Sequence, residues 1–114
     1  MGKRPRSRPP IQKVIDETIR LRPPRRGATL REEVWKDEVG EVVKYNLAYV
    51  NPNICVRDNG RVLGYDNRHS QHHRHFMGKQ EPVEFNGYES LAARFIREVH
   101  LLWRREDEET RKGH

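Results

Sequence analysis

The sequence has a single cysteine and no long apolar segment, and both absences exclude classes of protein. Cys55 has no second cysteine in the chain with which to form a disulfide. The longest uninterrupted apolar stretches are residues 47–50 and 101–103, whereas a membrane-spanning helix needs roughly 20 apolar residues. The first twenty residues carry charge and proline where a secretory signal would carry an apolar core. These features exclude a transmembrane helix and predict a cytoplasmic protein.

Apolar residues are few, and several common catalytic patterns are missing. Only 33% of the 114 residues are hydrophobic, which at this length predicts one domain with a small margin of stability. The chain has no glycine-rich phosphate loop, no Gly-x-Ser-x-Gly elbow and no paired cysteines of a zinc ribbon. We therefore expect neither a cofactor nor a structural metal.

Positive charge is concentrated at the start of the chain. The 23 Lys and Arg exceed the 17 Asp and Glu, which gives a net charge of +6. Residues 1–27 hold nine of these bases and two acids, a balance of +7, so the rest of the chain sums to −1. We expect residues 1–27 to be a basic arm that is partly disordered, above all in its proline-rich first ten residues. Such an arm is expected to bind a polyanion, which could be nucleic acid, an acidic partner or a membrane surface. A solubilising tail that binds no partner would have the same composition.

The middle of the chain has the alternating pattern of β-strands. Residues 41–50, rich in β-branched and aromatic side chains, form the clearest strand. Asn59-Gly60 is a strong turn signal. Further extended segments are predicted at residues 61–67, 72–77 and 82–85. Residues 11–21 fit neither period, so a short helix and an edge strand both remain open.

From Tyr88 the period changes to that of a helix. Leu91, Phe95, Val99 and Leu102 recur at spacings of four, four and three, which predicts one apolar stripe. Asn86 and Glu89 are spaced as a capping box. A run of strands followed by one helix favours an α+β fold: an antiparallel sheet of four to five strands with the long C-terminal helix packed on one face. The predicted domain spans residues 28–105, and residues 106–114 are a polar tail.

Histidine is concentrated in one segment. Four of the six histidines lie in residues 69–75. In an extended segment His73, His75 and Met77 share one face, while His72, Arg74 and Phe76 share the other. Hairpin pairing would bring Tyr65 and Asp66 across from them.

These residue types suit RNA cleavage without a metal. The reaction needs a base for the 2′-hydroxyl proton, a cation for the charge growing on phosphorus, and an acid for the leaving oxygen. Imidazole serves as acid or base at neutral pH, and guanidinium binds phosphate. The candidate catalytic residues are His73, His75, Arg74, Asp66 and Tyr65. The candidate RNA-binding residues are Lys44, Tyr45, His72 and Arg61.

Other interpretations of the same residues remain open. His73, His75 and Asp66 would form a two-histidine, one-carboxylate metal site. The histidines could instead be structural, bonded to the turn and to the helix. Tyr45 and Tyr49 on a strand are more often packing residues than base-stacking ones.

The chain resembles the TumE family. The resemblance covers about residues 28–103, and its most specific part is the order Gly64-Tyr65-Asp66-Asn67 and then His73-Arg74-His75. Members are small prokaryotic proteins encoded beside an antitoxin and assigned as the toxin of a type II toxin–antitoxin pair. The resemblance implies a growth inhibitor neutralised by a tightly bound partner, a small DNA-binding antitoxin. It places Tyr65, Asp66, His73, Arg74 and His75 at characteristic positions of the family.

Two function classes follow. In the first, the protein is a toxin that cleaves RNA as a metal-independent endonuclease, with Arg74 on the phosphate and His73 or His75 as base and acid. In the second, it is a non-catalytic module that binds nucleic acid or protein, and its histidines are structural or hold a metal.

Overall fold

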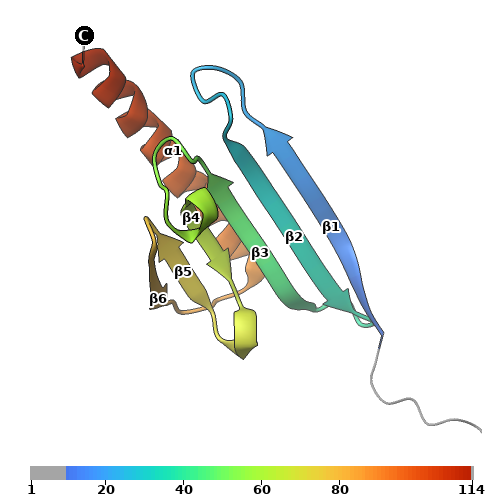
Figure 1. Ribbon diagram of the computed structural model, residues 1–114. Helices are drawn as coiled ribbons and strands as arrows, with labels where there is room; N and C mark the ends of the chain where they lie inside the picture. The colour runs from blue at the N-terminus through green and yellow to red at the C-terminus, as the bar shows by residue number, and fades with distance from the viewer. Residues whose placement is uncertain (1–9, 114) are drawn as a thin grey trace, which may run out of the picture.

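A six-stranded antiparallel sheet and one long helix make up the computed structural model, which describes residues 10–113 (Figure 1). Consecutive strands are neighbours, so the order across the sheet is β1-β2-β3-β4-β5-β6. The strands are β1 Ile11–Arg20, β2 Thr29–Asp37, β3 Val42–Val50, β4 Arg61–Asp66, β5 His73–Phe76 and β6 Lys79–Pro82. Short 3-10 turns at Asp58–Gly60 and Arg68–Ser70 flank β4, and helix α1 spans Tyr88–Lys112. The α+β fold with one C-terminal helix is confirmed.

The sheet has six strands, whereas four to five were expected. The additional strand is β1, formed by residues 11–20. This strand pairs with β2 along its whole length. A bulge between Lys13 and Ile15 exchanges the two faces of β1, since side chains alternate with a period of two. That exchange hides the strand pattern in the sequence. Disorder was expected for residues 1–10. All of these except Pro10 lie outside the described part of the chain.

The loop between β1 and β2 packs on the C-terminal half of α1. The Arg25 guanidinium lies 4.8 Å from the centroid of the Trp103 ring and donates a 2.8 Å hydrogen bond to the Trp103 carbonyl oxygen. Its Nε donates to Glu106 at 3.0 Å, and Glu106 also accepts from the Tyr49 hydroxyl at 2.8 Å. Residues 11–27 therefore belong to the folded domain and not to the separate basic arm expected for residues 1–27.

Helix α1 covers one face of the sheet over β3 and β4, and the core lies between them (Figure 1). The predicted stripe is confirmed: Leu91, Phe95 and Val99 are buried, and Leu102 is partly buried. These residues meet the buried side chains of β3 and β4, which are Tyr45, Leu47, Tyr49, Leu63 and Tyr65.

The start of α1 differs from the predicted one. Its N-cap is Gly87, at a φ of 103°, and no side chain caps the helix, so the predicted Asn86–Glu89 capping box is wrong. At the other end α1 continues to Lys112, which makes most of the expected polar tail helical. This is the one α-helix in residues 10–113, and it is too polar to cross a membrane.

The last strand is shifted from the predicted residues 82–85 to Lys79–Pro82. Met77 and Gly78 have φ values of 50° and 84° and form the tight turn between β5 and β6. This turn fixes the register of the hairpin, with His73 opposite Pro82. The chain then leaves the sheet, and Val83 and Phe85 pack against the core.

Candidate functional site

The histidines of β5 lie on the face of the sheet opposite α1, which we call the open face. Leu63 and Tyr65 of β4 point into the core, so Gly64 and Asp66 point the other way. Their partners across the ladder are His75 and His73 respectively. The alternation predicted for the two histidines is therefore what the sheet shows.

Asp66 is the centre of the site. Its carboxylate is buried, with 5% of the residue exposed. One oxygen, Oδ1, lies 3.7 Å from Nδ1 of His73, and the other, Oδ2, lies 3.0 Å from Nε2 of His75. The second contact is close enough for an ion pair but is not aligned as a hydrogen bond, since Nε2 of His75 has no hydrogen-bond partner in the described chain. Asp66 thus places one carboxylate oxygen beside each imidazole.

Arg61 supplies the cation beside this group. Its Nη1 lies 3.3 Å from Asp66 Oδ2, and its Nη2 lies 3.2 Å from Nδ1 of His75. Asp58 holds the guanidinium from the other side, with an Nε to Oδ2 distance of 2.7 Å. The contact with Arg61 makes Nδ1 of His75 an acceptor, so the proton of the neutral ring belongs on Nε2, toward Asp66.

Each residue of the segment Gly64-Tyr65-Asp66-Asn67 has a different structural role. A Cβ on Gly64 would lie 2.5 Å from Cδ of Arg61, so only glycine lets Arg61 lie across the open face. Tyr65 packs into the core, and the Asp66 carboxylate lies beside both histidines. The Asn67 side chain accepts from the backbone N–H of Tyr45 and donates to the carbonyl oxygen of residue 43, which ties the end of β4 to β3.

His75 is the more enclosed imidazole. Burial, together with the Arg61 guanidinium, lowers its pKa below the usual value of a histidine, although Asp66 and Asp58 oppose this shift. A lowered pKa means that the folded protein binds a proton at His75 less readily than the unfolded chain does. His75 is therefore neutral at pH 7.

This shift predicts a loss of stability in mild acid. The stabilisation that depends on neutral His75 is complete above the unfolded pKa of about 6.5 and is lost as the pH falls below it. We expect the urea midpoint to fall between about pH 7 and pH 5, and to fall less steeply in His75→Gln. His100→Gln, at an exposed position of α1, is the control. An equal pH slope in wild type and His75→Gln would contradict the prediction.

Arg74 and Tyr65 lie on the other face of the sheet. The Arg74 guanidinium bonds to Glu98 of α1 at 3.3 Å and to the Tyr65 hydroxyl at 3.2 Å. The Tyr65 hydroxyl donates to Glu98 at 2.6 Å, and burial together with this carboxylate raises its pKa to about 12. Arg74, although a candidate catalytic residue together with His73 and His75, therefore does not lie beside them, because neighbouring residues of a strand point to opposite faces.

The four predicted RNA-binding residues are divided in the same way. Tyr45 is buried under α1, and its hydroxyl lies 2.8 Å from Nδ1 of His72. His72 stacks on Phe85 with ring centroids 4.0 Å apart. Tyr45 and His72 therefore make packing contacts. For Tyr45, packing was the alternative interpretation of the sequence. Lys44 and Arg61 lie on the open face.

Two residues of the open face, Trp35 and Arg68, were missed from the sequence. Trp35 lies between its cross-strand neighbours Lys13 and Lys44, whose Nζ atoms are 4.8 and 4.6 Å from its ring centroid. Arg68 is exposed in the turn after β4. Its position directly before the histidine segment is a sequence signal that could have identified it. No pattern in the sequence identifies Trp35, because only the strand register brings it beside Lys44.

Two adjoining hollows lie on the open face. The histidine hollow, about 200 Å³, is lined by Asp66, Arg68, His69, His73, His75 and Gln80. The tryptophan hollow, about 340 Å³, is lined by Glu33, Trp35, Lys44, Tyr45, Asn46, Asp66 and Arg68. Asp66 and Arg68 border both, so the hollows form one continuous surface. Burial would raise the pKa of Glu33, but hydrogen bonds from Lys13, Asn46 and Arg31 lower it to about 2.

The alternative of a metal site formed by His73, His75 and Asp66 finds no support in the geometry. Within residues 10–113, no three His, Cys, Asp or Glu side chains are placed so that they could hold a metal ion. The two histidines approach different oxygens of Asp66, and the Arg61 guanidinium, a cation, contacts both Asp66 Oδ2 and Nδ1 of His75.

Comparison with known proteins agrees with the resemblance in the sequence. The family model described as Toxin TumE matches residues 11–102, which includes β1 and thus more of the chain than the expected residues 28–103. No curated protein and no solved structure shows significant similarity to the chain. The matched segment contains all six strands and most of α1. The chain belongs to the TumE toxin family.

Proposed function

We propose that this toxin acts by cleaving RNA on the open face, without a metal. The observation that carries the proposal is the histidine hollow itself, where an imidazole next to a buried carboxylate stands beside Arg68 and a second imidazole, His69. Arg68 takes the place first assigned to Arg74, because Arg74 lies on the α1 face. The toxin–antitoxin pair is taken to be of type II, with a protein antitoxin.

His73 is the proposed general base. Its Nδ1 is on the side of Asp66, which leaves Nε2 to face the substrate, as in other carboxylate-oriented imidazoles. Nε2 removes the proton of a ribose 2′-hydroxyl, and the 2′-oxygen attacks the adjacent phosphorus. The bond from phosphorus to the 5′-oxygen breaks, and His69 donates the proton that this oxygen needs. The products are a 2′,3′-cyclic phosphate and a 5′-hydroxyl.

Arg68 and His75 have supporting roles. Arg68 is exposed at the border of both hollows and neutralises the charge that grows on the phosphate oxygens. His75 is a positioning residue, since its ring nitrogens face Arg61 and Asp66. Together with Arg61 it holds the Asp66 carboxylate in place beside His73.

The tryptophan hollow gives the substrate a second point of contact. A nucleobase can stack on the Trp35 indole, and Lys44 reaches a phosphate. Stacking of this kind requires unpaired bases, so single-stranded RNA is the proposed substrate.

Incubation of the purified protein with end-labelled single-stranded RNA tests this function. We expect cleavage that chelator does not inhibit and that a substrate with 2′-deoxy sugars does not undergo. Arg68→Ala should weaken RNA binding and reduce its dependence on salt, whereas Arg97→Ala, on an exposed part of α1, should change neither. Cleavage that is lost with chelator and restored by a divalent metal would contradict the mechanism. Growth arrest without any cleavage would support the non-catalytic binding module instead.

A further inference from the structure

Helix α1 is too narrow to cover the sheet. Six strands spaced at about 4.8 Å span roughly 24 Å, whereas a helix with its side chains is about 10 Å across. The helix packs on β3 and β4, and β1 and β2 extend past it (Figure 1). The α1-side face of β1 and β2 therefore has space for a second helix beside α1, at the usual 8–10 Å between axes.

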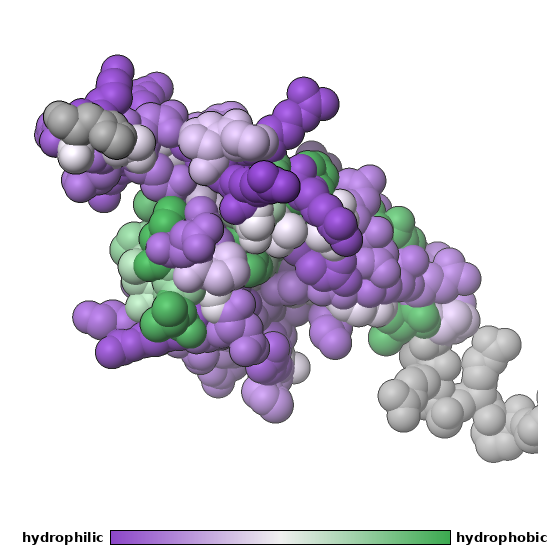
Figure 2. All heavy atoms as spheres, turned by 45° about the horizontal axis from the view of Figure 1, so that its top comes forward, coloured by the Kyte–Doolittle hydropathy of each residue, from purple (hydrophilic) through white to green (hydrophobic). Residues whose placement is uncertain are grey.

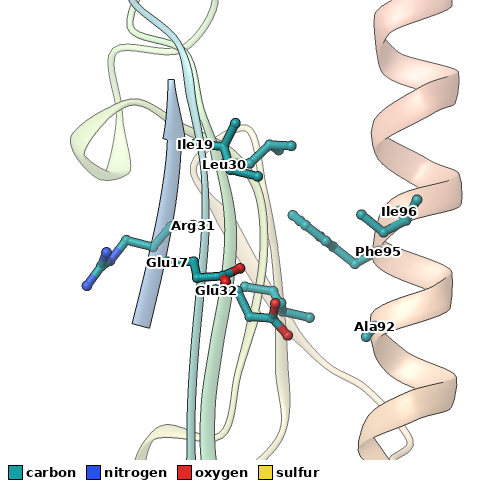
Figure 3. A pocket seen from close by; sticks show the side chains of 9 residues that line it. Glu17, Ile19, Leu30, Arg31, Glu32, Ala92, Phe95 and Ile96 are labelled. Atoms are coloured by element: carbon teal, nitrogen blue, oxygen red, sulfur yellow. The ribbon is translucent and has the colours of Figure 1, made fainter. Parts of the chain in front are cut away.

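An apolar cavity marks this space. It measures about 150 Å³ and lies between α1 and the first two strands. Ile19 and Leu30 point toward the helix, and Ala92, Phe95 and Ile96 line it from α1, whereas Arg31 points away (Figure 3). An apolar cavity of this size can hold a group as large as a benzene ring. One large aliphatic or aromatic side chain fits it.

The rim of the cavity exposes apolar surface that the core does not use. Ile19 is 55% exposed and Ile96 is 43% exposed. An exposed apolar rim around a cavity is typical of a docking site. The face of the molecule seen in Figure 2 is mostly hydrophilic, with a few separate hydrophobic patches.

Two carboxylates define the charge of the site. Glu17 and Glu32 lie opposite each other on β1 and β2, and both point into the space beside α1 (Figure 3). Glu32 accepts a 2.6 Å hydrogen bond from the Tyr88 hydroxyl, whereas Glu17 is exposed and has no ion pair or hydrogen bond within residues 10–113. In a chain of net charge +6, this is a local acidic spot that selects a basic partner.

We propose that this cavity receives an amphipathic helix of the antitoxin, which packs beside α1 over β1 and β2. One large apolar side chain of that helix fills the cavity, and a Lys or Arg one turn away pairs with Glu17. The inference rests on membership of a toxin family, which implies an antitoxin, and not on the RNA chemistry of the open face. A helix fits better than an added strand, because the bulge between Lys13 and Ile15 disrupts the free edge of β1.

The test is a calorimetric titration of the purified toxin with its antitoxin, the product of the neighbouring gene that relieves growth arrest. We expect Ile96→Glu and Glu17→Lys each to weaken the complex roughly tenfold or more, because the first puts a charge against an apolar contact and the second repels the basic residue. Leu101→Glu and Glu38→Lys are the matched controls. Leu101 is an exposed aliphatic residue on the other flank of α1, at 56% against 43% for Ile96, and Glu38 is exposed in the turn before β3. Neither control should change the affinity.

Three outcomes would overturn the inference. The first is wild-type affinity in both Ile96→Glu and Glu17→Lys. The second is an equal loss of affinity in Leu101→Glu and Glu38→Lys. The third is a toxin dimer that these variants convert to monomer, since a second copy of the chain would then be the occupant. Both variants alter exposed residues, and circular dichroism checks their folding. RNA cleavage should be unchanged in them, so a failure of the nuclease proposal leaves this test intact.

Discussion

Replacing His73 with Ala should lower the rate of RNA cleavage by about 10²- to 10⁴-fold, the range typical of a lost general base. In the proposed mechanism His73 is the base: its Nδ1 lies 3.7 Å from Asp66 Oδ1, and its Nε2 faces the substrate. RNA affinity should stay close to that of wild type, because proton transfer contributes to the transition state and little to the ground state. Single-turnover cleavage and a separate binding titration measure the two effects.

His100→Ala is the control for this substitution, since it removes an exposed imidazole from α1, far from the hollow. Full activity in His73→Ala would remove this residue from the chemistry.

Replacing Phe95 with Ala should lower the free energy of unfolding by about 3–5 kcal/mol, which is a large part of the stability of a domain this small. Phe95 is 3% exposed and meets the Tyr65 ring edge to face, with centroids 6.3 Å apart. It is the middle residue of the buried stripe that holds α1 on the sheet. Its loss leaves a cavity where the helix, β3 and β4 meet.

Urea denaturation followed by circular dichroism measures this effect. Arg97→Ala, two residues along the same helix and exposed, should change the stability by less than about 0.5 kcal/mol. If Phe95→Ala gave the same denaturation curve as Arg97→Ala, α1 would not be packed on the sheet as described. If Phe95→Ala is unfolded in buffer, Phe95→Leu provides a smaller change in the same direction.

The parts of the fold that the sequence predicted are those with an uninterrupted period. The stripe of α1 repeats every three or four residues, and β3 alternates regularly from Tyr45 to Tyr49, beyond the irregularity at its start, so both were recognised. Strand β1 was not, because the bulge between Lys13 and Ile15 shifts its apolar residues from one face to the other. The end of β6 was misplaced because the turn at Met77 and Gly78 sets it, and a residue such as Met rarely adopts a positive φ.

The site was predicted in part, for a related reason. Alternation along one strand places His73 and His75 together, and it also sends Arg74 to the other face. The cation that contacts His75 is Arg61, which comes from β4 and reaches this imidazole across Gly64. The same holds for Trp35 and Lys44, which become neighbours through the pairing of β2 with β3. Contacts between strands depend on register, which a single sequence does not specify.

The RNA ends formed by the purified toxin identify the cleavage chemistry. Phosphorus NMR or mass spectrometry of a short cleaved RNA distinguishes the possible products. We expect a 2′,3′-cyclic phosphate on one fragment and a 5′-hydroxyl on the other, formed in the presence of chelator and absent from His73→Ala reactions. Fragments with a 5′-phosphate, or intact RNA under conditions in which the toxin arrests growth, would contradict this expectation.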